Sequence, residues 1–227
     1  MTTPVRLLLI VLAGAVAAVV VAVMAERSAP ADGTLRTEDG DTVIVTGESR
    51  AAGLRFAPEV APADQAWIMA AIAAARPEAA ALLAEVDGLV TVGVLAPLGD
   101  GTLGITRSGP MGFRVELDVT RLNADRAMDR ATVVLHELGH VIDFALVDAA
   151  TGRALDAQIP RGGPCGLATG CDMPEERFAD TFAKWALRGA VSAAGAGYGV
   201  ASPASLEDWG TPLATLAIKI QVASRRA

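Results

Sequence analysis

Two histidines and a glutamate carry the most specific chemical signal in this chain. His136 and His140 are four residues apart, and they are the only histidines in the 227-residue sequence. On a helix this spacing places both imidazoles on one face, where they can bind the same tetrahedral zinc ion. Glu137 follows the first histidine, and a carboxylate there can accept a proton as water attacks a carbonyl carbon. The alternative is an ordinary helix with incidental histidines, but random placement gives this pattern only about one time in a thousand.

The third metal ligand has two candidates. Glu176 and Asp180 lie four residues apart on a predicted downstream helix, so they share a face. One carboxylate can then bind zinc while the other accepts the distal N–H of an imidazole. A solvated acidic face is the ordinary alternative. Asp143 is the rival ligand, but a regular helix aims three successive same-face groups at one ion poorly, so a supporting or structural role is preferred.

Two cysteines and one tyrosine complete the candidate residues. Cys165 and Cys171 could join the two histidines in a structural Cys2His2 zinc site. Their spacing is wider than that of usual zinc-binding pairs, and outside the cytoplasm a disulfide between them is favoured. Tyr198 is the only tyrosine and lies in a glycine-rich segment, from which it could stabilise an oxyanion. A packed or exposed tyrosine is the ordinary alternative.

The motif HELGH, followed by ERFADTF at residues 176–182, resembles the zincin metallopeptidases that use a glutamate ligand, the gluzincins. It is also similar to the lethal-factor-like peptidases. The metzincin pattern would require glycine at 143 and histidine at 146, where this chain has Asp143 and Leu146. The resemblance covers about residues 113–188. It implies a zinc cofactor held by His136, His140 and Glu176, with Asp180 supporting a histidine. It also implies a metalloendopeptidase rather than an exopeptidase.

The composition and the N-terminal segment indicate the partners and the location of this chemistry. A formal charge of -7 and a pI near 4.9 argue against a nucleic-acid partner, since phosphate binding needs a basic surface. Residues 7–25 are uncharged and apolar, and they predict a signal anchor or a signal peptide. Residues 26–50 are polar and turn-rich, with one β-like run at 42–46, and predict a linker. Residues 51–227 are then a catalytic domain outside the cytoplasm, membrane-anchored or secreted.

Hydrophobic patterning predicts the elements that position the motif. Helices are expected at 62–75, 77–85, from about 124 or 126 to 147, from about 172 to 188 with Asp172 and Glu175 as a capping pair, and at 212–224. Strands are expected at 89–95, 102–106 and 113–119, the first two forming a hairpin through the turn at 97–101. The fold class is α+β: a zincin-like domain with a small mixed sheet, an active-site helix and a second metal-ligand helix.

The predicted strand 113–119 precedes the motif helix. In zincins a strand in this region commonly runs along the cleft, and the resemblance implies that it binds an extended substrate by strand addition. An interior or solvent-facing strand is the alternative. The function expected is zinc-dependent hydrolysis of peptide bonds in a protein or peptide substrate. The alternative is a non-catalytic, membrane-anchored protein with a Cys2His2 site or a degenerate zincin fold. No feature of the sequence defines the substrate.

Overall fold

The computed structural model describes residues 34–36, 42–44, 54–97, 101–124, 129–161, 173–189 and 199–224. The chain divides into two units, Met1–Asp32 and Gly33–Ala227, and all of the described residues belong to the second. The predicted membrane segment at 7–25 lies outside them. Within the described ranges, no helix is long and apolar enough to cross a membrane. The predicted linker contains a short antiparallel pair, β1 (Thr34–Arg36) and β2 (Thr42–Ile44), of which only the second was expected.

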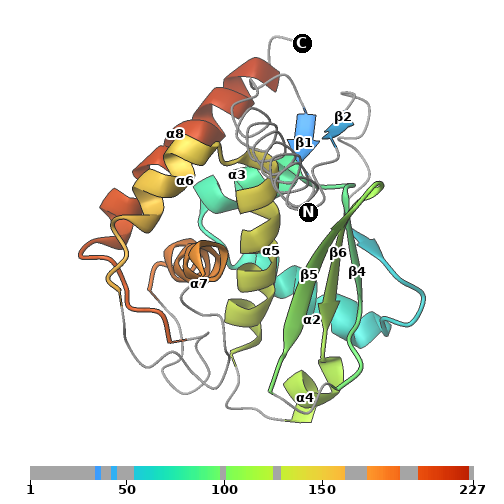
Figure 1. The fold of residues 1–227 in the computed structure, drawn as a ribbon. Helices are drawn as coiled ribbons and strands as arrows, with labels where there is room; N and C mark the ends of the chain where they lie inside the picture. Colours follow the sequence, from blue (N-terminus) through green and yellow to red (C-terminus); the bar gives the residue numbers. More distant parts are fainter. Residues whose placement is uncertain are drawn as a thin grey trace, which may run out of the picture. The chain divides into compact units, whose positions relative to one another are not determined.

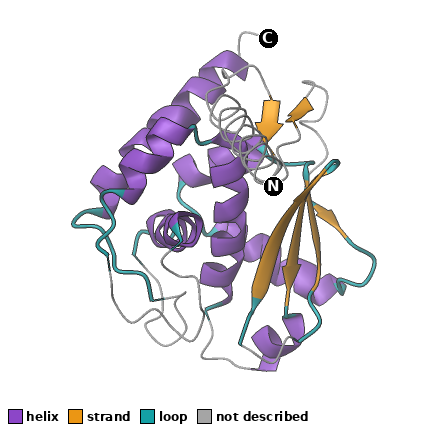
Figure 2. Ribbon diagram, in the orientation of Figure 1, coloured by secondary structure: helices purple, strands orange, loops and turns teal. Residues whose placement is uncertain are grey.

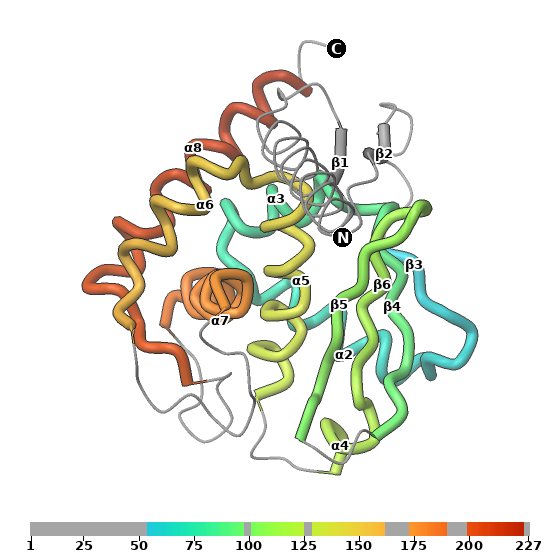
Figure 3. The backbone as a smooth tube through the Cα atoms, viewed as in Figure 1, coloured from blue at the N-terminus to red at the C-terminus, as the bar shows by residue number. Residues whose placement is uncertain are grey.

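The main sheet is mixed and has four strands: β3 (Arg55–Phe56), β4 (Val90–Val94), β5 (Gly104–Gly109) and β6 (Gly112–Leu117). Their order is β3-β4-β6-β5, with β4 parallel to both β3 and β6 (Figure 3). The fold is therefore α+β, as predicted.

The predicted hairpin across residues 97–101 is wrong, because β5 pairs antiparallel with β6 and not with β4. The reversal of the chain is made by the next turn, between Gly109 and Gly112. Gly112 has a φ of +110°, and a side chain there would lie 2.2 Å from the carbonyl oxygen of Leu89. Only glycine suits both requirements, so the tight turn forms at this point.

The strand predicted at 113–119 is confirmed for its first part, where buried and exposed side chains alternate. Phe113, Val115 and Leu117 are buried, while Arg114 between them is exposed. The strand ends at Leu117, however, and Val119 begins the short helix α4 (Val119–Ala124). Because β6 is paired on both sides, its backbone is not available to a substrate, and that expectation is wrong. The strand at the edge of the sheet nearest the motif is β5.

The first two predicted helices are confirmed as α2 (Pro62–Ala73) and α3 (Pro77–Glu85), each with proline in its first turn. The motif helix, α5 (Arg130–Leu146), begins later than expected, because the Asp129 carboxylate caps the N–H groups of Ala131 and Thr132. The next helix, α6 (Ala149–Asp156), was not predicted: Asp148 caps it in the same way, and Gly152 lies within it.

The last two helices differ from the prediction at their starts. Helix α7 (Pro174–Ala186) has Met173 at its N-cap, one residue later than predicted, and Asp172 of the predicted capping pair lies outside the described residues. Its stop is as predicted, since Gly189 has a φ of +75° and donates its N–H to the Lys184 carbonyl. Helix α8 (Leu206–Ser224) begins six residues before Pro212, which lies inside it, because Ser205 Oγ accepts the N–H of Asp208.

Helix α5 lies between the sheet and α7 (Figures 1 and 2). It packs against β5 and β6 on one side and against α7 on the other, and it also contacts α2 and α3. Every residue from Thr132 to Ile142 is buried. A helix that is buried all round normally carries only apolar side chains, so the polar groups of the HELGH motif must find partners in the interior.

Candidate metal centre

Three predicted ligands lie together between α5 and α7. His136 Nε2 is 3.2 Å from Glu176 Oε2, and His140 Nε2 is 3.5 Å from Glu176 Oε1. One ligand atom from each of the three residues can be chosen so that all lie within 4.8 Å of one another. Both imidazoles are buried, and Glu176 is partly exposed. This group is able to bind a metal ion, with two histidines from α5 and one carboxylate from α7.

The spacing of these atoms can be compared with that of a metal site. Ligand atoms about 2.0–2.1 Å from a tetrahedral zinc lie about 3.3 Å apart. The two separations between imidazole nitrogen and carboxylate oxygen, 3.2 and 3.5 Å, are close to this value. Two imidazoles and one carboxylate are also the donor set of a catalytic zinc that keeps one position open. The residues present therefore fit a zinc ion.

Gly139 allows the two helices to approach closely enough to form this group. A methyl group at position 139 would lie 3.0 Å from the Cα atom of Ala179 and 3.2 Å from its carbonyl oxygen. The contact is with backbone, which cannot move aside as a flexible side chain can. Helix α7 therefore packs directly against α5 at Gly139, and this close crossing brings Glu176 to the histidines.

The charges of the site stabilise one another. Burial raises the pKa of Glu176, but hydrogen bonds and charge interactions with His136 and His140 outweigh it and hold this pKa well below its usual range. Burial lowers the pKa of His140, but the hydrogen bond with Glu176 and the charges of Glu137, Glu176 and Asp143 hold it above its ordinary value. The ring of His140 also stacks on Phe144, with ring centroids 6.0 Å apart. The site is thus a place of concentrated negative charge that suits a cation.

Glu137 lies on the side of α5 that faces β5. Its side chain is buried, and Thr106 Oγ1 is 2.8 Å from Glu137 Oε2 and 2.9 Å from the Glu137 carbonyl oxygen. Gly104 lies beside the same carboxylate. Neither Thr106 nor Gly104 was predicted to belong to the site. Their spacing of two residues on one strand predicts that they share a face of the sheet. This spacing indicates that they contact Glu137 only once the register of β5 is known.

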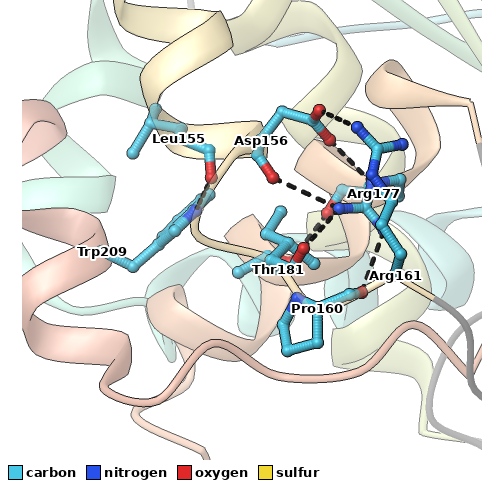
Figure 4. A network of polar contacts seen from close by, with 8 residues as sticks. Leu155, Asp156, Pro160, Arg161, Arg177, Thr181 and Trp209 are labelled. Atoms are coloured by element: carbon cyan, nitrogen blue, oxygen red, sulfur yellow. Dashed lines mark hydrogen bonds and ion pairs between the residues drawn. The ribbon is translucent and has the colours of Figure 1, made fainter.

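The residue after Glu176 fixes α7 to α6. Arg177 is buried, and its Nε donates to Asp156 Oδ1 at 2.7 Å (Figure 4). Its other nitrogens donate to the carbonyl oxygens of Pro160, Asp156 and Ile159. Consecutive residues on a helix point in different directions, so Arg177 can hold the first turn of α7 against α6 while Glu176 faces the histidines.

Replacing Arg177 with methionine is expected to lower the free energy of unfolding by about 3 kcal/mol, because it removes one donor from a carboxylate and from each of three carbonyl groups. Arg177→Lys should cost nearly as much, since an ammonium cannot reproduce the fork of the guanidinium. Arg153→Met, at an exposed position on α6, is the matched control. Urea denaturation measures all three, and a change below about 1 kcal/mol for Arg177→Met would contradict this account of the joint.

Two further candidates, Asp180 and Asp143, lie on the same two helices as the ligand group. The Asp180 carboxylate is fully buried, and its Oδ2 accepts a hydrogen bond from Lys184 Nζ at 2.6 Å. Lys184 Nζ also donates to the carbonyl oxygen of Val200. Support of an imidazole by Asp180 therefore stays a prediction. Asp143 is not part of the three-residue group, although its charge raises the pKa of His140.

Tyr198, Cys165 and Cys171 lie outside the described residues. The predicted oxyanion role of the tyrosine and the predicted disulfide between the cysteines therefore stay predictions.

Comparison of the chain with protein-family models, with curated proteins and with solved structures gives no match.

Proposed function

We propose that this chain is a zinc-dependent metallopeptidase of the zincin type, in which His136, His140 and Glu176 hold the ion and Glu137 is the general base. The observation that carries the proposal is the convergence of the three ligands between α5 and α7, with Glu137, the residue after the first ligand, held against β5. Metal binding alone would not need Glu137. A buried carboxylate next to a ligand is, however, what proton transfer at such a site requires.

Zinc is proposed because two imidazoles and one carboxylate form a mixed nitrogen and oxygen donor set. When bound, zinc would acidify a water molecule and polarise the carbonyl group of the peptide bond to be cleaved. The chain supplies the rest of the chemistry. Glu137 accepts a proton from the attacking water and returns it to the leaving nitrogen, which cannot depart as an unprotonated amide ion.

The edge strand β5 is proposed to bind the substrate. It pairs with β6 on one side and has no strand partner on the other within the described ranges. An extended peptide can add there as a further strand through backbone hydrogen bonds. Glu137 contacts the same strand through Thr106, so a peptide bound along β5 passes close to the base. We therefore propose β5, and not residues 113–119, as the strand that binds the substrate.

The structural Cys2His2 site remains the rival for the two histidines. It gives Glu176 and Glu137 no role. The proposal is supported by the carboxylate oxygens of Glu176, which lie 3.2 and 3.5 Å from the two imidazole nitrogens, and by the contact of Glu137 with Thr106 on β5. Action outside the cytoplasm, with residues 7–25 as anchor or signal, remains part of the proposal on the sequence pattern alone.

Removal and return of the metal test the proposed function. The purified full chain should contain one zinc per molecule and cleave a denatured protein substrate, lose this activity on dialysis against a chelator, and regain it at one equivalent of zinc. Magnesium should not restore activity, because it prefers oxygen ligands in octahedral geometry. Cleavage that survives complete removal of zinc would reject the proposal.

A further inference from the structure

Strand β5 presents small side chains to the motif helix. Thr106 pairs with Val115, and Gly104 pairs with Leu117, so both lie on the face of the sheet that carries the buried side chains of β6. Helix α5 packs against this face. The two positions adjoin one residue of α5, Glu137, whose side chain is buried.

We propose that β5 forms a seat for the Glu137 carboxylate, in which Thr106 and Gly104 are positioning residues for proton transfer. The inference rests on the proposed function for its consequence in catalysis, but the seat itself is a property of the folded chain. Thr106 acts through Glu137 and has no other assigned part in the reaction.

The contribution of Thr106 follows from its two contacts. Its hydroxyl lies within hydrogen-bond distance of the Glu137 carboxylate and of the carbonyl oxygen of the same residue. A hydrogen bond from this hydroxyl restrains the far end of Glu137, which three rotatable bonds would otherwise leave free to adopt other rotamers. A hydroxyl has one proton to donate, and an ionised carboxylate is the stronger acceptor. The carboxylate is therefore held in one orientation before substrate arrives.

Gly104 contributes space. A methyl group at position 104 would lie 2.6 Å from Glu137 Oε1 and 2.7 Å from Cδ, which is too close for any pair of these atoms. The groups in its way belong to the end of a flexible side chain and not to backbone. Alanine at 104 should therefore displace the carboxylate without disrupting the sheet, so that the position of Glu137 changes while the fold persists.

The first experiment measures catalysis of a peptide substrate by the zinc-loaded full chain. Thr106→Val keeps the shape of the side chain and removes the hydroxyl, and it should lower kcat by about 10- to 100-fold with KM changed less than about threefold. Thr106→Ser should restore most of the loss. Gly104→Ala should lower kcat similarly. Thr91→Val makes the same change on β4. Thr91 pairs with Arg114, so it lies on the opposite face of the sheet, and the substitution should leave kcat unchanged.

The second experiment needs neither metal nor substrate. In the chelated full chain, Thr106→Val should lower the urea midpoint, because it leaves the buried Glu137 carboxylate without its donor. In a Glu137→Met background the same substitution should have no such effect, since no carboxylate remains to accept the bond. Equal shifts in both backgrounds would mean that Thr106 does not hold Glu137, and the seat would be rejected.

The outcomes separate this inference from the proposed function. A chain that cleaves nothing but shows the coupling between Thr106 and Glu137 would keep the seat and reject the peptidase. An active chain in which Thr106→Val retains full kcat would keep the peptidase and reject the positioning role.

Discussion

Glu137→Gln is expected to keep one zinc per chain and to lower kcat by about 10²- to 10⁴-fold. The amide has nearly the shape of the carboxylate, so it can remain in contact with β5 and still accept the hydrogen bond from the Thr106 hydroxyl. It cannot, however, accept a proton from water at neutral pH. Because His136, His140 and Glu176 are unchanged, the metal should stay bound. The measurement is zinc content by elemental analysis beside initial rates on a fluorogenic peptide.

The control for this variant is Glu59→Gln, which removes an exposed carboxylate whose partner is Arg114 on the sheet. It should leave the rate unchanged, because an exposed ion pair contributes little to stability and its loss leaves the fold intact. If Glu137→Gln cleaves peptide at the rate of the unmodified chain, Glu137 is not the base. If the variant instead loses zinc, Glu137 acts as a ligand, and the assignment of the site must change.

Glu176→Ala is expected to remove most of the zinc. It deletes the only ligand that α7 supplies to the group, and two histidines alone hold the ion poorly. The substitution should not unfold the protein, since the Glu176 side chain is 27 % exposed and leaves no closed cavity. Zinc content after dialysis against a weak chelator, with folding checked by circular dichroism, measures the effect. Glu175→Ala, the adjacent residue in the first turn of α7, is the matched control and should keep its zinc.

The other candidates should rank below Glu176 in the same assay. Asp180→Asn is expected to weaken zinc binding about 10- to 100-fold if Asp180 supports an imidazole. It should also lower stability, because Lys184 would lose the charged partner it has in the interior. Asp143→Asn and Cys165→Ser should retain most of the metal. Full zinc in Glu176→Ala together with an empty site in Asp143→Asn or Cys165→Ser would transfer the third ligand to that residue.

Sequence reasoning predicted the ligand group because it depends on spacing along helices. A separation of four residues puts His136 and His140 on one face, and Gly139 between them marks the place where another helix approaches. Pairing with Glu176 required only that a second helix cross the first. These features depend on residues close together in the sequence, so they can be predicted from local spacing.

The parts that were missed depend on contacts between distant segments. The choice between a β4–β5 and a β5–β6 hairpin was decided at Gly112, where the positive φ and the close approach of Leu89 both require glycine. Local pattern could not show that β6 would take the central position, and so the edge strand was assigned to the wrong residues. Thr106 and Gly104 could be recognised as neighbours of Glu137 only once this register was known. The ion pair of Asp180 with Lys184 was within reach, as the residues are four apart on one helix.

The most direct measurement of the central claim is mass spectrometry of a peptide mixture after incubation with the zinc-loaded full chain. New peptide termini should appear with the unmodified chain, and they should be absent with Glu137→Gln and in the presence of a chelator. This pattern would require both the ion and the base, as the proposed mechanism does. A chain that holds one zinc between His136, His140 and Glu176 but yields no new termini from any peptide or denatured protein would contradict the account, and would favour a non-catalytic zinc protein.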